Sequence, residues 1–253
     1  MNKIALYTLA KREIVRTFKI INQVVWPPII STFLYIFVFG LSLGSKIETI
    51  NGIPYLQFLI PGLIIMQIID GSYGESSASL FTMRFSNSIQ ELLVAPMSYF
   101  EMVFGFIIGS LFRALIIGNL ILVITYFIIG TTIYSIPAYI FFIVMTSVCF
   151  SSIGLVVGLW GEKFDHMAIL TTFFITPLVF FGGVFHSIRL LPENLQIYTL
   201  FNPIFYIIDG FRFSLTGKLD GSLLYSVLVL GLMTLIFLSF ALYLFRKGYK
   251  LRI

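Results

Sequence analysis

Six long apolar runs constrain this chain more than any other feature of its sequence. A helix needs about 20 apolar residues to cross a hydrocarbon core about 30 Å thick. The runs that reach or approach this length are 24–43, 55–74, 100–129, 137–160, 168–186 and 222–245. Only 11% of the residues are charged and 58% are hydrophobic, whereas soluble domains carry about 25% charged residues. We therefore predict an all-α membrane protein, folded as a single six-span transmembrane domain over residues 1–253.

Lysine and arginine predict the orientation of the spans, because they gather on the cytoplasmic side of membrane proteins. They cluster at both ends of the chain: Lys3, Lys11, Arg12, Arg16 and Lys19 at one end, and Arg246, Lys247, Lys250 and Arg252 at the other. Both termini are therefore predicted to be cytoplasmic. The loops 75–99 and 160–167 then lie inside, and the loops 44–54, 130–136 and 187–221 lie outside. The net charge of +5 reflects this topology and does not indicate nucleic-acid binding.

An amphipathic helix is predicted for residues 1–22. Its apolar side carries Tyr7, Ala10, Ile14, Phe18 and Ile21, and another side carries Thr8, Arg12, Arg16 and Lys19. Such a helix fits the membrane interface, with the apolar side toward lipid and the cations toward anionic headgroups. It either only anchors the chain or also contacts a partner. A secretory signal is excluded, because the apolar run that follows is long and no small-residue cleavage site ends it.

The stretch 81–101 separates the second and third apolar runs and is far less apolar than either. It runs from polar residues (Arg84, Ser86, Asn87, Ser88) to a mixed segment (Ile89, Gln90, Glu91, Leu92, Leu93) that Pro96 ends. The one-sided apolar stripe predicts a short amphipathic helix. Because it joins two spans on the predicted cytoplasmic side, this helix is well placed to receive a push from a soluble partner.

The outer segment 187–221 is too apolar for a solvated loop and too interrupted to span. Pro192, Asn202, Pro203 and Gly210 break it into short pieces. One interpretation is a pair of half-apolar helices that dip into the outer leaflet, which is tolerated where protein or a cavity shields the backbone. The other is an interfacial helix that lies flat.

Two charged residues fall inside predicted spans, Asp70 in the second and Arg113 in the third. Intramembrane charges are costly and usually face protein or water. Arg113 either lines a transport path or pairs with Asp70, or else both side chains snorkel to an interface. We hypothesise that Arg113 is needed for transport but not for folding.

Small residues recur four positions apart, a spacing that lets membrane helices approach closely. The pairs are Gly40 and Gly44, Gly105 and Gly109, and Gly154 and Gly158, with a similar row of Ser110, Ala114 and Gly118. The pattern predicts close helix packing without indicating which helices pair.

The sequence contains no motif for binding or consuming a nucleotide. No G-x-x-x-x-G-K-[ST] loop occurs, and no Ser/His/Asp, Cys/His or paired-carboxylate set stands out. His166 and His186 have no ligand-spaced partners, and Cys149 lies alone in an apolar run. We therefore expect no catalytic residue, no metal site and no cofactor on this chain.

Four blocks, in order along the chain, carry a resemblance to a known family. They are Tyr55–Leu63 (YLQFLIPGL), Ser88–Pro96 (SIQELLVAP), Thr176–Pro192 (TPLVFFGGVFHSIRLLP) and Asn202–Arg212 (NPIFYIIDGFR). The chain resembles the permease subunits of ABC-2 type exporters over essentially its whole length, and within them the YadH-type inner-membrane permeases.

The resemblance implies a permease of the bacterial cytoplasmic (inner) membrane that works as a homodimer with two copies of a separate ATP-binding cassette subunit. ATP and magnesium would bind that partner. The exported cargo would be an amphiphile such as a lipid, a glycan or a drug. The family's N-terminal interfacial helix matches residues 2–21, and its re-entrant outer helices match 187–213.

The resemblance also assigns candidate functional residues. Its coupling helix matches Arg84–Pro96, and its second cytoplasmic loop matches Gly161–His166. The candidate coupling residues are Arg84, Asn87, Ile89, Glu91, Leu92, Pro96, Glu162 and Lys163. The candidate path residues are Arg113, Phe173, Phe181, Asn202, Tyr206 and Arg212. Aromatic residues near 173–185 either line the path or face lipid and neighbouring helices.

Three alternatives to an exporter remain open at this point. An ATP-independent carrier or channel usually needs acidic or histidine relays within its spans, and Asp70 is nearly alone. A membrane-embedded enzyme would need a catalytic cluster assembled from distant helices. A permease-like subunit that anchors or regulates, with no cargo of its own, has the same sequence features as an exporter.

Overall fold

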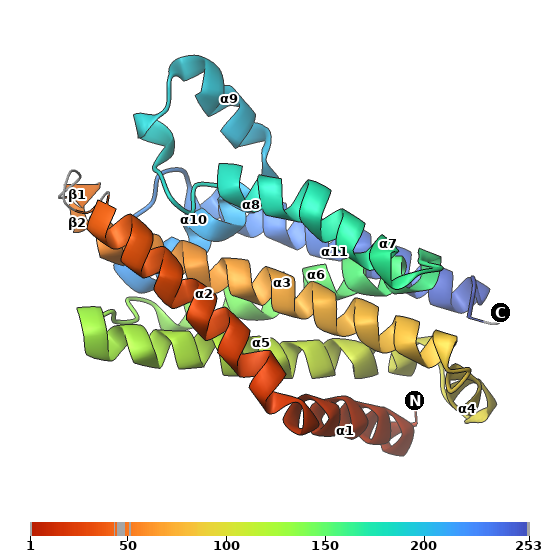
Figure 1. Ribbon diagram of the computed structural model, residues 1–253. Helices are drawn as coiled ribbons and strands as arrows, with labels where there is room; N and C mark the ends of the chain where they lie inside the picture. Colours follow the sequence, from red (N-terminus) through yellow and green to blue (C-terminus); the bar gives the residue numbers. More distant parts are fainter. Residues whose placement is uncertain (1, 43, 45–48, 51, 252–253) are drawn as a thin grey trace.

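The computed structural model describes residues 2–42, 44, 49–50 and 52–251 and is mainly helical (Figure 1). Predictions that concern Met1, Leu43, Arg252 and part of the loop 44–54 lie outside the described residues. The described chain starts and ends toward the same end of the bundle as α4, and the strands β1 and β2 lie at the opposite end (Figure 1). This arrangement agrees with an even number of spans.

Six helical stretches of the described chain are long and apolar enough to cross a membrane, which confirms the predicted class. They are α2 (Ile21–Ser42), α3 (Tyr55–Phe85), α5 (Tyr99–Ile129), α6 (Ile136–Trp160), the composite stretch Phe164–Phe181 and α11 (Leu223–Lys247). The composite stretch consists of α7 (Phe164–Leu170), a π-helical turn η1 (Thr171–Ile175) and α8 (Thr176–Phe181).

Shorter elements connect these helices. They are α1 (Lys3–Lys19), β1 (Thr49–Ile50), β2 (Ile53–Pro54), α4 (Ile89–Val94), the 3-10 turn η2 (Ile188–Leu190), α9 (Glu193–Phe201) and α10 (Pro203–Thr216). The two strands pair antiparallel, with Thr49 opposite Pro54 and Ile50 opposite Ile53. Asn202 separates α9 from α10, so the outer segment contains two helices with a break between them.

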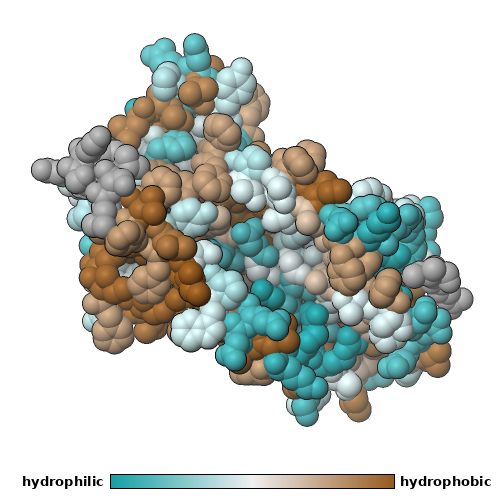
Figure 2. Space-filling model, viewed as in Figure 1, coloured by the Kyte–Doolittle hydropathy of each residue, from teal (hydrophilic) through white to brown (hydrophobic). Residues whose placement is uncertain are grey.

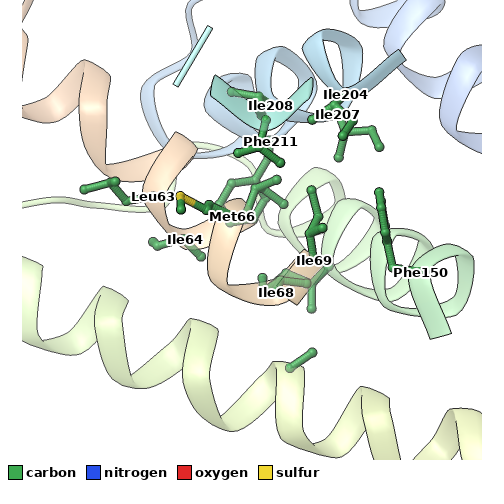
Figure 3. Packing of buried hydrophobic residues seen from close by; sticks show 14 of the residues in the cluster. Leu63, Ile64, Met66, Ile68, Ile69, Phe150, Ile204, Ile207, Ile208 and Phe211 are labelled. Atoms are coloured by element: carbon green, nitrogen blue, oxygen red, sulfur yellow. The ribbon is translucent and has the colours of Figure 1, made fainter. Parts of the chain in front are cut away.

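Helix α3 is the centre of the bundle, and most of its residues are buried. It packs against α5, α6, α10 and α2. Figure 3 shows the core around Leu63 and Ile68 of α3, where Phe150 of α6 and Ile207 and Phe211 of α10 converge. In a bilayer these side chains exchange lipid contacts for protein contacts, so close van der Waals packing stabilises the arrangement of the three helices.

The small residues mark two close helix contacts. A Cβ atom on Gly154 of α6 would collide with Ser76 and the backbone of α3, and one on Gly158 would meet Ser77 and Leu80. On α5, the absent side chains of Gly105 and Gly109 leave room for α1. The spacing thus predicts close packing correctly, and the structure supplies the partners.

Helix α3 continues 11 residues beyond the predicted end of the second apolar run, from 74 to Phe85. The polar residues in this extension suggest a loop, yet most of them are buried. Ser76, for example, donates a hydrogen bond to the carbonyl of Ser72 (3.0 Å) within the helix. A polar side chain that returns its hydrogen bond to its own helix can be buried in a membrane bundle.

Much apolar surface remains exposed in the single chain, as expected where lipid or another subunit covers it. Phe37 of α2, Phe173 of η1 and Leu235 of α11 are each more than 60% exposed. In the view of Figure 2, apolar residues gather toward the β1–β2 end, and polar residues are more frequent toward the α4 end. Helix α9 projects away from the bundle at the top of Figure 1.

Candidate functional site

The end of the bundle that carries α4 contains most of the candidate coupling residues. Helix α4 covers only Ile89–Val94, a shorter helix than the predicted segment 84–96. A turn precedes it, in which Asn87 adopts a left-handed conformation with φ 59°. Asparagine tolerates this conformation better than most residues, which explains how the chain reverses between α3 and α4.

Arg84, a candidate coupling residue from the resemblance, is buried at this end. Its side chain is only 5% exposed. Its Nε donates to the carbonyl of Lys250 (2.7 Å), and its Nη1 donates to the carbonyls of Gly158 (2.7 Å) and Gly161 (3.1 Å). Because the helix end at α6 leaves unpaired carbonyls, a nearby guanidinium satisfies them. Arg84 therefore joins the ends of α3, α6 and α11.

The candidate residues of α4 divide into buried and exposed sets. Ile89 is 4% exposed and packs beneath the helix, and Leu92 is half-buried. Asn87, Glu91 and Pro96 are exposed. The apolar stripe thus holds α4 against the bundle, and the polar side faces away, as its amphipathic pattern predicts.

The loop between α6 and α7 lies beside the end of α3. Phe164 at the start of α7 contacts Phe81 and Phe85 of α3, with ring centroids 4.6 and 6.0 Å apart. Glu162 is exposed and accepts a hydrogen bond from Lys250 Nζ (2.8 Å). This hydrogen bond holds the pKa of the Glu162 carboxyl below its usual value.

Exposed side chains at this end of the bundle come from the end of α3, from α4 and its flanking residues, and from the α6–α7 loop, and we name them together the α4-end surface. Its members are Phe85, Asn87, Glu91, Val94, Pro96, Glu162, Lys163 and Phe164. Val94 is 88% exposed and Phe85 68% exposed. Large apolar side chains beside charged ones on a surface of this kind favour contact with another protein.

A second polar site lies within the bundle and centres on Glu75 of α3. Its two carboxylate oxygens accept hydrogen bonds from Arg16 of α1 and Arg113 of α5, each at 2.6 Å. Glu75 is 3% exposed. The predicted alternative that Arg113 pairs with Asp70 is therefore wrong, because the arginine reaches the acid one turn further along α3. Arg113 thereby holds α5 to α3, and the hypothesis that folding does not need it is tested below.

Helix α1 adds a second carboxylate, Glu13, which is 1% exposed. It accepts a hydrogen bond from Ser79 of α3 (2.6 Å) and lies 3.3 Å from Arg16. Glu13 and Leu9 sit over the glycines Gly109 and Gly105 of α5. The side of α1 that faces the bundle thus carries a buried acid, which the division of this helix into an apolar and a basic side did not reveal.

The exposure of the other α1 side chains also changes the interpretation of residues 1–22. Ala10, assigned to the lipid-facing side, is buried, whereas Tyr7 and Phe18 of that side are 66% and 55% exposed. Phe18 also contacts Phe112 of α5, with ring centroids 5.5 Å apart. Helix α1 therefore runs alongside the first half of α5 (Figure 1).

Arg212 of α10, a candidate path residue, is enclosed by its own chain and is 2% exposed. It donates to the carbonyls of Gly183 (2.6 Å) and Phe58 (3.3 Å), and its guanidinium carbon lies 3.8 Å from the Phe58 ring centroid. Asp209 lies 3.7 Å away. This burial contradicts a position on an open path and indicates that Arg212 joins α10 to α3 and to the turn after α8.

The remaining path candidates separate in the same way. Asn202 is buried, caps α10 through Ile204 N–H (3.0 Å) and donates to the carbonyl of Leu178 (2.6 Å), so it is a structural residue. Tyr206 is half-buried. Phe173 and Phe181 are 70% and 63% exposed on the outside of the composite span, where lipid or another subunit can contact them.

The described residues contain no group of three or more His, Cys, Asp or Glu side chains that could hold a metal ion. In that part of the chain, Glu75 and Glu162 form ion pairs with arginine or lysine, and Glu13 and Asp209 accept hydrogen bonds from serine or the backbone. The described residues thus provide exposed surfaces for contact with other molecules and ion pairs between helices.

Comparison with known proteins assigns the family. The model of the ABC-2 type transporter family matches residues 4–216. The inner membrane transport permease YadH of Escherichia coli (strain K12) is 36% identical over 249 residues, which cover 98% of this chain and 97% of YadH. Nodulation protein J of Rhizobium leguminosarum bv. viciae is 25% identical over 191 residues, covering 73% and 72% of the two chains. The chain belongs to the ABC-2 type transporter family and is a multi-pass membrane permease.

Proposed function

We propose that this permease is the transmembrane subunit of an ATP-driven exporter and that the α4-end surface receives the force. The observation that carries the proposal is the position of α4 between two long helices. Its ends are joined to α3 and α5 by segments of only a few residues, 86–88 and 95–98. A displacement of α4 is therefore passed to both spans with little slack.

The start of α5 is well suited to receive such a displacement. Ser98 and Glu101 form a reciprocal capping box, in which Ser98 N–H donates to Glu101 Oε2 (2.7 Å). The backbone N–H of Asn2 donates to the other oxygen of Glu101. Capping fixes the first turn of a helix, so α4, α5 and the start of α1 are expected to move together.

The central position of α3 then distributes the movement. Its far end contacts α10 through Arg212, and its middle contacts α5 and α1 through Glu75. We infer that a push on the α4-end surface displaces the helices that surround the transport path. The fuel would be ATP hydrolysed on a separate ATP-binding cassette subunit, because the sequence contains no phosphate-binding loop.

The finer assembly follows the family pattern and is part of the proposal. Two copies of this chain would associate, with two ATPase subunits on the cytoplasmic side and both termini of each permease cytoplasmic. The exposed aromatic side chains Phe173 and Phe181 would lie at the surface between the copies or along the path. Helices α9 and α10 would enter the outer leaflet, and the cargo would be an amphiphile.

Site-directed cysteine labelling tests the orientation. Cys149 is buried and is the single natural cysteine, so it is first replaced by serine. A cysteine at Glu91 should react with an impermeant maleimide only in inverted vesicles, and one at Tyr198 of α9 only in intact cells. Labelling of Glu91→Cys from outside the cell would refute the proposal.

Coupling is tested with Glu91→Arg and Leu92→Asp in vesicles that contain the permease and its ATPase. We expect both variants to insert and to lose ATP-dependent movement across a panel of labelled lipids, glycans and drugs. Glu193→Arg, an exposed charge reversal on α9, is the matched control and should transport normally. Transport without ATP, or unchanged transport in both α4 variants, would contradict the mechanism.

A further inference from the structure

A cavity of about 460 Å³ lies at the α4 end, outside the α4-end surface. It is bordered by α4 and the segment after it, the start of α5 and the end of α11. Leu93, Met97, Met102 and Phe245 form its apolar wall, and Arg246 and Lys247 border it as well. The open surface of the cavity is mostly polar, with two adjacent cations beside a smaller apolar part, and no acidic residue borders it.

Aromatic residues place this cavity at the level of lipid headgroups. Tyr99 borders it at the start of α5, and Tyr249 follows α11 by two residues. Trp160, at the end of α6, lies near Tyr249, because its carbonyl accepts a hydrogen bond from Nζ of the neighbouring Lys250 (3.4 Å). Tyrosine and tryptophan gather at the membrane–water interface, so these residues indicate that the cavity lies at headgroup level.

The two cations of the cavity carry charge that is available to a ligand. Lys250 is neutralised by Glu162, with Nζ 2.8 Å from Oε1. By contrast, no carboxylate of a described residue lies within 4.0 Å of Arg246 or Lys247. A mostly polar cavity at headgroup depth, with a small apolar part and two cations that no described carboxylate contacts, is complementary to an anionic lipid.

A second cavity provides an internal comparison. It has a volume of about 540 Å³, lies between α1 and α5, and is lined by apolar side chains including Phe100 and Phe104. Its lining includes Glu101 but no lysine or arginine. An acyl chain fits there as well, but nothing in this cavity favours an anionic headgroup.

We propose that the cavity between α4, α5 and α11 is a binding site for an anionic phospholipid. Arg246 and Lys247 hold the headgroup phosphate, and one acyl chain lies along Leu93 and Met97, the partly exposed apolar residues of the lining. The lipid thereby connects the end of the last span to the segment that carries α4. The proposal rests on the cavity and its charges and does not depend on the proposed function.

Native mass spectrometry of the purified full-length chain tests the site, with phosphatidylglycerol and phosphatidylcholine titrated separately. We expect the wild type to bind phosphatidylglycerol at least tenfold more tightly. Each juxtamembrane cation contributes about a fivefold effect, so Arg246→Gln combined with Lys247→Gln should abolish most of this preference. Millimolar glycerol 3-phosphate should not displace the lipid, because the free headgroup lacks the apolar contact.

The matched control is Lys11→Gln with Lys19→Gln, which removes two exposed cations of α1 outside the cavity. This pair should keep the preference for phosphatidylglycerol. Met97→Trp fills the apolar part of the cavity and should weaken phosphatidylglycerol binding while Arg246 and Lys247 remain. The proposal is overturned if the wild type binds both lipids equally, if both double variants lose the same affinity, or if Met97→Trp has no effect in a correctly folded protein.

Discussion

Replacing Glu75 by glutamine tests whether the buried ion pairs hold three helices together. The side chain keeps its size but loses its charge, so Arg16 and Arg113 lose the carboxylate that each contacts at 2.6 Å. Breaking a buried ion pair by removing one partner costs about 3–5 kcal/mol. The arginine side chains remain 29% and 20% exposed, which lets water or lipid phosphate reach them. We therefore expect a loss of about 3 kcal/mol, at the lower end of this range.

The measurement is reversible unfolding of the purified permease in mixed micelles, followed by circular dichroism. A double-mutant cycle with Arg113→Gln separates the ion pair from other effects, since it removes the unpaired arginine that the single variant leaves. We expect the two substitutions together to cost less than the sum of the two single losses, by about 1 kcal/mol or more. The cycle also tests whether folding needs Arg113.

Asp70→Asn is the matched control, because Asp70 lies on the same helix and, among the described residues, forms no ion pair. Because this change breaks no ion pair, it should lower stability much less than Glu75→Gln does. The reasoning is refuted if Glu75→Gln is as stable as the wild type. It is also refuted if the losses of Glu75→Gln and Arg113→Gln simply add, since the two charges would then be independent.

Two further predictions address α1 and the α6–α7 loop. Gly109→Leu should separate α1 from α5 and raise the cleavage of α1 by trypsin several-fold. Gly231→Leu is the control, since a Cβ there meets nothing within 4 Å, and it should leave cleavage unchanged. Equal cleavage of the two variants would contradict the packing. Because the folded-state pKa of Glu162 is lowered, its contact with Lys250 should persist at neutral pH and be lost only below the ordinary value of about 4.3. The fluorescence of Trp160, in a variant whose other tryptophan is phenylalanine, should report this change, and Glu162→Gln should remove it.

The class of the protein follows from the sequence because lipid imposes strict requirements on it. A span must be long, apolar and helical, so six apolar runs indicate six candidate spans and the order of the helices. The apolar stripe of α4 likewise predicts which side of this helix is buried, because Ile89 is apolar and Glu91 is charged. These features depend on neighbours along the chain, which the sequence displays directly.

The hydrogen-bond and ion-pair partners of the buried arginines cannot be predicted from the sequence. Arg84 and Arg212 each reach the carbonyls of segments far away in the chain, and a basic residue in a predicted loop carries no signal of that burial. Arg113 shares Glu75 with Arg16, which α1 brings to the same acid. The position of α1 depends on two glycines of α5, and their spacing indicates a close contact without naming the helix that makes it.

The π-helical turn η1 has a consequence for how the fifth span can be altered. A π turn accommodates one more residue than an α-helical turn, and each residue advances an α-helix by about 100°. Removing a single residue from Thr171–Ile175 would therefore convert η1 into an ordinary α-helical turn and leave the direction of Phe181 nearly unchanged. The same deletion within α7 would instead turn Phe181 by about 100° toward a different neighbour.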